Sequence, residues 1–132
     1  MADFKILIVD DDKKICTLLA DELQDEGFVT FIAHNGVDAF KIVQSKQIDL
    51  VISDINMQNG NGIKLLNNIN NMGTFSRPAV VMISGFSKLS KKELIERGAS
   101  DYIKKPINFK SLLKTIDHYV QIKKSRQKKL AS

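Results

Sequence analysis

The sequence predicts a doubly wound α/β fold, in which helices cover both faces of a parallel sheet. Short, continuous apolar runs alternate with longer segments whose apolar residues recur at helical spacing, and five such pairs fill residues 4–120. Apolar runs of this kind are typical of parallel strands that are buried on both faces. Parallel strands in turn require helical crossovers. At 132 residues and 43% hydrophobic content, the chain has the size of one domain.

The five predicted strands are runs rich in β-branched and aromatic residues. They cover residues 4–9, 28–33, 48–53, 79–83 and 101–104. The five predicted helices lie between or after them, each with an apolar stripe. The stripes are Ile15, Leu18, Leu19 and Leu23; Val37, Phe40 and Val43; Leu65, Leu66, Ile69 and Met72; Leu94 and Ile95; and Phe109, Leu112, Leu113, Ile116 and Val120.

Capping residues support these helix positions. Asn35 and Asn108 are suited to the N-caps of the second and fifth helices, and Ser90 with Glu93 forms a capping-box pattern before the fourth. Gly27 and Gly98 are natural helix stops. We therefore expect short loops between well-defined elements.

The net charge of +5 comes entirely from the end of the chain. Residues 1–120 carry equal numbers of basic and acidic residues, whereas residues 121–132 hold five basic residues and no acidic one. We expect residues 1–120 to form the domain and residues 121–132 to be a basic tail or linker, where the helix frays. Nucleic-acid binding by the neutral domain itself is not expected.

Composition excludes several classes of site. One cysteine, Cys16, permits no disulfide within the chain, and two histidines leave no His-rich metal site. Three aspartates interrupt the first apolar run, which excludes a secretory signal, and no stretch has the roughly 18 apolar residues of a membrane span. The sequence holds no GxxxxGK motif. We expect a cytoplasmic protein without membrane segments.

Candidate functional residues follow the predicted strands. In doubly wound sheets, ligands bind beyond the carboxyl ends of the strands. Asp10 and Asp11 follow the first strand, Asp54 the third, Ser84 the fourth and Lys105 the fifth. Clustered carboxylates repel one another unless a cation is present, and Mg²⁺ prefers oxygen ligands. Lysine and serine suit a phosphoryl group, so this set predicts phosphoryl transfer with a carboxylate nucleophile.

The same residues lie in four ordered motifs. ILIVDDD, DLVISDINMQNGNG, VVMISG and GASDYIKKPI resemble the motifs of the response regulator receiver domain of two-component signalling, over residues 4–120. This resemblance implies a flavodoxin-like fold, with a five-stranded parallel sheet in the order 2-1-3-4-5 and five helices on its two faces.

The resemblance also assigns roles to individual residues. Asp54 corresponds to the phosphoacceptor. Mg²⁺ would be held by Asp11 directly, by Asp10 through water, by Asp54, and by the backbone carbonyl of Asn56. Ser84 corresponds to the switch hydroxyl, Tyr102 to the switch aromatic and Lys105 to the lysine that pairs with the phosphoryl group. The Lys105–Pro106 bond is expected to be cis.

The implied function is signalling rather than turnover catalysis. A histidine kinase or phosphotransfer protein would phosphorylate Asp54, and the face of the fourth helix, fifth strand and fifth helix would then control a partner, an output domain or a homodimer. One alternative is an interaction domain of the same fold that does not use phosphate. A second is a phosphohydrolase of the haloacid dehalogenase type, since Asp10 and Asp12 form its DxD pattern.

Overall fold

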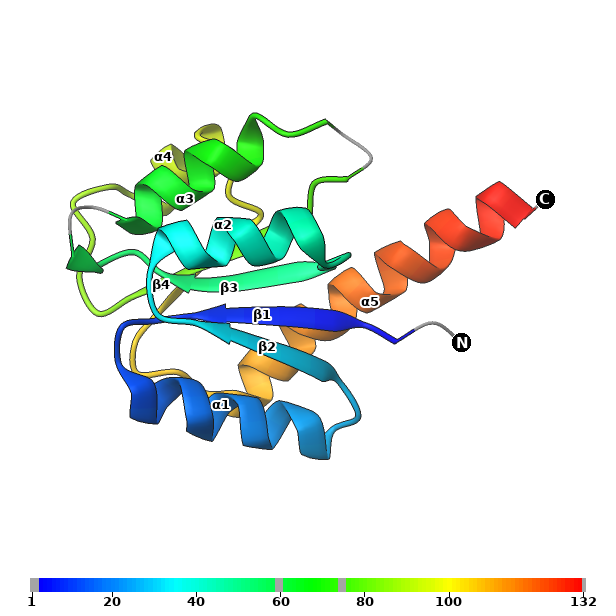
Figure 1. Ribbon diagram of the computed structural model, residues 1–132, viewed down its shortest axis with the longest axis horizontal. Helices are drawn as coiled ribbons and strands as arrows, with labels where there is room; N and C mark the ends of the chain where they lie inside the picture. The colour runs from blue at the N-terminus through cyan, green and yellow to red at the C-terminus, as the bar shows by residue number, and fades with distance from the viewer. Residues whose placement is uncertain (1–2, 59–60, 74–75, 132) are drawn as a thin grey trace.

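The computed structural model describes residues 3–58, 61–73 and 76–131, and it confirms the predicted fold class (Figure 1). The sheet has five strands in the order β2-β1-β3-β4-β5, and every neighbouring pair is parallel. This order matches the one that the resemblance implies. Two residues of the acceptor motif, Asn59 and Gly60, lie outside the described residues.

The strands lie close to their predicted positions. Their bounds are β1 Lys5–Val9, β2 Val29–Ala33, β3 Leu50–Asp54, β4 Ala79–Ser84 and β5 Asp101–Lys104. Both β3 and β4 end one residue later than predicted, at Asp54 and Ser84. These two polar side chains therefore belong to the regular sheet, which fixes their backbone.

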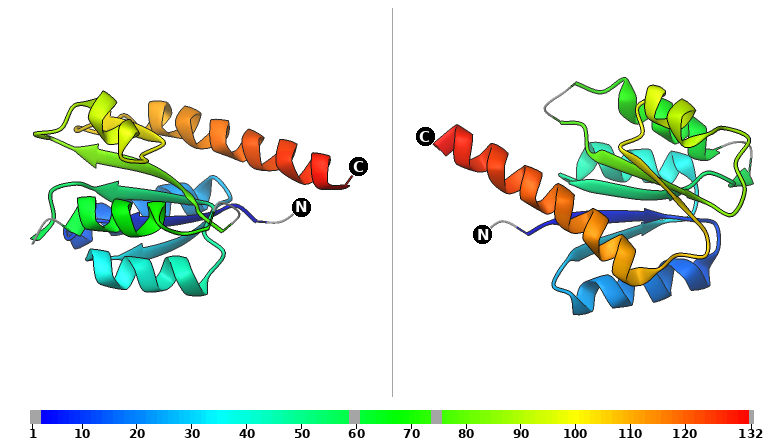
Figure 2. Two further views of the ribbon diagram at one scale, coloured as in Figure 1. Left: turned by 90° about the horizontal axis from the view of Figure 1, so that it is seen from above. Right: turned by 180° about the vertical axis from the view of Figure 1, so that it is seen from behind.

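Helices cover both faces of the sheet, as Figures 1 and 2 show. The bounds are α1 Lys13–Asp25, α2 Gly36–Ser45, α3 Asn61–Asn70, α4 Lys91–Glu96 and α5 Phe109–Ala131. Helices α2, α3 and α4 share one core, and α1 and α5 share the other. The three central strands send alternate residues into the two cores. The first core contains Leu7, Val9, Val51, Val80 and Met82; the second contains Ile6, Ile8, Leu50, Ile52, Val81 and Ile83.

Three residues of the predicted apolar stripes are exposed. Leu18 and Val37 are each 63% exposed, and Ile95 is 45% exposed. Small residues such as Ala20 on α1 and Ala39 on α2 are buried instead. The predicted stripes include only large apolar side chains, whereas the buried face of α1 combines small residues with Leu19 and Leu23.

The predicted capping residues act as expected. Asn35 Oδ1 accepts a hydrogen bond from Asp38 N, and Asn108 Oδ1 accepts one from Ser111 N. Ser90 and Glu93 complete the capping box of α4. Both Gly27 and Gly98 have positive φ angles, +93° and +107°, which only glycine adopts readily.

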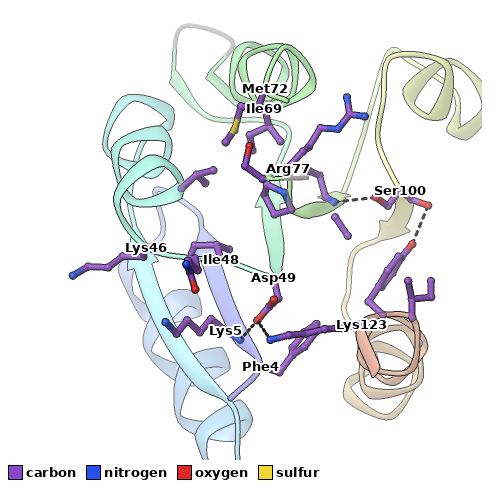
Figure 3. Close-up of a pocket in the computed structure, with 18 of the residues that line it drawn as sticks. Phe4, Lys5, Lys46, Ile48, Asp49, Ile69, Met72, Arg77, Ser100 and Lys123 are labelled. Atoms are coloured by element: carbon purple, nitrogen blue, oxygen red, sulfur yellow. Dashed lines mark hydrogen bonds and ion pairs between the residues drawn. The ribbon is translucent and has the colours of Figure 1, made fainter. Parts of the chain in front are cut away.

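Helix α5 continues to Ala131 and so includes the basic residues of the predicted tail or linker. The helix extends past the sheet in both views of Figure 2. Lys123 fastens this extension to the start of the sheet, because its Nζ lies 3.1 Å from Asp49 Oδ2 and 5.8 Å from the centre of the Phe4 ring (Figure 3). Asp49 Oδ2 also accepts from the backbone N of Lys5 at 2.8 Å. No helix among the described residues has the length and hydropathy of a membrane span.

Candidate functional site

The predicted site residues meet at one edge of the sheet. Asp10 follows β1, Asp54 ends β3, Ser84 ends β4 and Lys105 follows β5. Parallel strands bring their carboxyl ends to the same edge, so residues far apart in the chain become neighbours here. Asp10 is 5% exposed, Asp54 7% and Ser84 not at all. These are buried polar groups, which need partners.

An acidic cluster forms the centre of the site. Asp10, Asp11 and Asp54 each offer a carboxylate oxygen, and these atoms lie within 4.8 Å of one another. Backbone donors orient two of the carboxylates: Asp12 N donates to Asp10 Oδ1 at 2.9 Å, and Asn56 N donates to Asp54 Oδ1 at 3.2 Å. A set made only of oxygen donors fits a hard divalent cation such as Mg²⁺ and does not fit metals that prefer sulfur or imidazole.

Lys105 reaches into the cluster from the loop after β5. Its Nζ lies 3.4 Å from Asp10 Oδ2 and 3.5 Å from Asp54 Oδ2. Partial burial favours a lower pKa for Lys105, but the negative charges of Asp10 and Asp54 outweigh it and raise the pKa above its ordinary value. The ammonium group therefore stays charged at neutral pH. The Lys105–Pro106 bond is cis, as predicted.

Asp54 is held in an environment that disfavours its charge. Burial raises its pKa most, and the neighbouring carboxylate of Asp10 raises it further. Lys105 and the backbone N–H of Asn56 favour the carboxylate but only partly offset these effects. A charge that is disfavoured in the folded protein lowers stability, and a bound cation would relieve that cost.

Replacing Asp54 with asparagine is therefore expected to raise the free energy of unfolding at neutral pH, without Mg²⁺, by about 1 kcal/mol. Because the pKa of Asp54 in the folded protein lies above its ordinary value, the wild type loses stability as pH rises from the ordinary pKa to the folded pKa. The gain from Asp54→Asn should shrink as pH falls to the ordinary value. Urea denaturation at neutral pH and at a pH near the ordinary pKa of aspartate measures this difference in stability. An Asp54→Asn protein that is less stable than the wild type at neutral pH contradicts the prediction.

Ser84 and Tyr102 are adjacent in the site. The Tyr102 hydroxyl donates to the backbone O of Ser84 at 3.5 Å, and the Tyr102 ring packs beside the core under α2, α3 and α4. The Ser84 hydroxyl bonds to the loop after β4: it donates to Phe86 O and accepts from Phe86 N at 3.0 Å. Ser84 also accepts from the Asn56 side chain, at 2.7 Å.

Two features of this site were not predicted from the sequence: the close approach of Gly62 to the backbone of Asp54 and Ile55, and the position of the Asn56 side chain. Gly62, at the start of α3, has no room for a side chain: a Cβ there would lie 2.5 Å from Asp54 O and 2.6 Å from Ile55 Cα. The glycine-rich stretch around Gly62 was the feature of the sequence that could have indicated this close approach. The Asn56 side chain was also missed, since only its backbone carbonyl was assigned a role, and no sequence pattern reports where a loop amide points.

Asp12 does not belong to the acidic cluster. Its side chain caps α1, with Oδ1 accepting from Lys14 N at 3.0 Å and from Ile15 N at 3.2 Å. The second aspartate of the DxD pattern is thus used as a helix cap, which argues against a phosphohydrolase built on Asp10 and Asp12.

Cys16 and His34 support the backbone of Asp10. Cys16 Sγ donates to Asp10 O at 3.3 Å, and His34 Nδ1 lies 3.1 Å from the same oxygen. Burial, followed by the charge of Asp10, raises the pKa of the Cys16 thiol to about 11. The thiol therefore stays protonated and is a structural donor.

Comparison with known families identifies this arrangement. The family model for the response regulator receiver domain matches residues 6–117, which contain every residue of the site. The chain belongs to the response regulator receiver domain family. Receiver domains are phosphoacceptor signalling modules of two-component systems rather than turnover enzymes, which agrees with the function that the sequence predicted.

The curated relatives are longer than the segment that matches. This chain is 36% identical over 112 residues to the transcriptional regulatory protein CpxR of Escherichia coli K12, a match that covers 85% of this chain and 47% of CpxR. It is 32% identical over 125 residues to the sensor histidine kinase RcsC of the same organism, covering 94% of this chain and 13% of RcsC. The chain thus spans about half the length of these curated relatives, or less.

Solved receiver structures share the fold. The chemotaxis response regulator CheY4 of Vibrio cholerae superposes with a TM-score of 0.79 at 28% identity, over 89% of this chain and 99% of CheY4. A CheY-like receiver domain protein of Methanospirillum hungatei gives a TM-score of 0.86 at 25% identity, over 95% and 99% of the two chains. The receiver domain described above therefore has the CheY-like architecture over nearly its whole length.

Proposed function

We propose that Asp54 accepts a phosphoryl group from the phosphohistidine of a histidine kinase or phosphotransfer protein. The observation that carries this proposal is the position of the Asp54 carboxylate, within 4.8 Å of the oxygens of Asp10 and Asp11 and 3.5 Å from the Lys105 ammonium. An Asp54 oxygen attacks phosphorus, the P–N bond to the donor imidazole breaks, and the imidazole leaves.

The residues around Asp54 would bind the metal ion and the phosphoryl group. Asp10, Asp11, Asp54 and the backbone carbonyl of Asn56 would hold Mg²⁺, which supplies positive charge to the phosphoryl oxygens. Lys105 is the residue suited to hold the transferring group by its fixed charge. Because Asp54 is buried, water has little access to its carboxyl group. This burial partly protects the acyl phosphate from hydrolysis once it has formed.

The readout is proposed to lie on the face of α4, β5 and α5. In this proposal the Ser84 hydroxyl moves to donate to the new phosphoryl group, and the Tyr102 side chain takes up the space released. That surface would then bind a downstream protein, an output domain or a second copy of the chain. A kinase partner that uses ATP also implies a location in the cytoplasm.

Residues 1–120 are proposed to act as the receiver unit. Residues 121–132 are proposed to link this unit to the protein or output domain that it controls. Two relatives support a regulatory setting, since CpxR is a transcriptional regulatory protein and RcsC a sensor histidine kinase. The basic helical extension of α5 suits such a connection because it projects beyond the sheet (Figure 1).

The proposal is tested by labelling with a small phosphodonor in the presence of Mg²⁺. The wild type is expected to gain one acid-labile phosphoryl group, and Asp54→Ala none. Asp21→Ala, which removes an exposed carboxylate on α1, is the matched control and should label like the wild type. Undiminished labelling of Asp54→Ala refutes the assignment, and omission of Mg²⁺ should suppress labelling of the wild type.

A further inference from the structure

The side chain of Asn56 joins the phosphoacceptor loop to the switch serine. Its Nδ2 lies 2.7 Å from Ser84 Oγ and 2.6 Å from Phe86 O. A backbone carbonyl can only accept, so the amide nitrogen, and not the amide oxygen, must face this pair. Both protons of the amide are thereby used. The backbone N of the same residue donates to Asp54 Oδ1 at 3.2 Å.

These contacts saturate the Ser84 hydroxyl. A hydroxyl has one proton to donate and two lone pairs that accept. The Ser84 proton is donated to Phe86 O, and the lone pairs accept from Asn56 Nδ2 and from Phe86 N at 3.0 Å. Ser84 is fully buried, so these protein partners, rather than water, satisfy its hydroxyl. The hydroxyl has no proton left for a group on Asp54 while this arrangement persists.

We infer that Asn56 is a positioning residue that holds Ser84 in its resting orientation. We call the three residues Asn56, Ser84 and Phe86 the latch. The inference rests on the proposed function, in which Ser84 must donate to a phosphoryl group on Asp54. That donation requires the hydroxyl to release Phe86 O, and the Asn56 amide stabilises the arrangement that has to be broken.

The latch also links the switch to the acceptor. Asn56 contacts Asp54 through its backbone and Ser84 through its side chain, so this one residue connects the Asp54 carboxylate to the Ser84 hydroxyl. The side chain of Phe86 takes no part, because only its backbone N and O are bonded and the residue is 70% exposed. The latch therefore depends on the amide of Asn56 and not on the aromatic ring.

Replacing Asn56 with leucine tests this inference, because leucine is of similar size and has no donor. Asn56 lies on the surface, so the change leaves the core intact. Loss of the amide hydrogen bonds should favour the released state of Ser84 about five- to tenfold. Asn56→Leu is expected to bind beryllofluoride with Mg²⁺ correspondingly more tightly than the wild type, measured by titration. Without beryllofluoride, its Ser84 and Tyr102 amide signals should shift toward their bound positions.

Matched variants separate the latch from a general effect on the loop. Phe86→Ala retains every latch contact and should bind beryllofluoride within about twofold of the wild type. In a Ser84→Ala background the latch is absent, so adding Asn56→Leu should change affinity no further. Equal or weaker binding by Asn56→Leu, when the wild type binds, overturns the latch alone. Failure of the wild type itself to bind overturns the proposed function instead.

Discussion

Replacing Gly62 with alanine is expected to destabilise the domain by about 3 kcal/mol or more and to displace the loop that carries Asp54. The added Cβ would lie 2.5 Å from Asp54 O and 2.6 Å from both the Cα and the O of Ile55. All three are backbone atoms, so no side-chain rotation relieves the overlap. Either α3 or the end of β3 must move.

Urea denaturation measures this effect, and Gly73→Ala provides the control. Among the described residues, the atom nearest to a Cβ at Gly73 would be Ser76 Oγ, at 3.8 Å, which is ordinary contact. Both variants remove one glycine from the unfolded chain, so the difference between them isolates the overlap at Gly62. Similar stability of the two variants contradicts a close approach of α3 to the acceptor backbone.

Replacing Lys105 with methionine is expected to slow labelling by a small phosphodonor about ten- to hundredfold. The ammonium group of Lys105 faces both buried carboxylates, at 3.4 Å and 3.5 Å. Its loss leaves the repulsion between Asp10 and Asp54 uncompensated and removes the positive charge that attracts an anionic donor. The pKa of Asp54, already raised, should rise further and reduce the nucleophilic carboxylate.

Lys104→Met is the control for this prediction. Lys104 is the last residue of β5, is exposed, and has the same charge and length as its neighbour. The net charge of the protein therefore changes equally in both variants. If labelling slows to the same extent in both, the effect is a matter of overall charge, and the specific role of Lys105 is excluded.

The arrangement of the site could be predicted because it depends mainly on strand ends. Once the apolar runs before Asp10 and Asp54 are assigned as parallel strands, topology brings both residues to one edge regardless of side-chain detail. The same holds for Lys105 after β5. The sequence contained enough information here because each residue directly follows or ends a strand.

Other features depend on packing that no local pattern reports. Leu18 is exposed while small residues of α1 are buried, since the distance between helix and sheet selects size as well as polarity. Helix α5 continues through the basic segment because Lys, Arg and Gln are good helix formers and because Lys123 is fixed by Asp49. The Asn56 amide was missed for a similar reason, since its partner Ser84 is 28 residues away.

A crystal structure of the protein with Mg²⁺ and beryllofluoride tests the central claim most directly. The account predicts beryllium bonded to a carboxylate oxygen of Asp54, with the metal held among Asp10, Asp11, Asp54 and the carbonyl of Asn56. Lys105 and the hydroxyl of Ser84 should contact the fluorines. Beryllofluoride on any other carboxylate, or a metal held away from the acidic cluster, would contradict it.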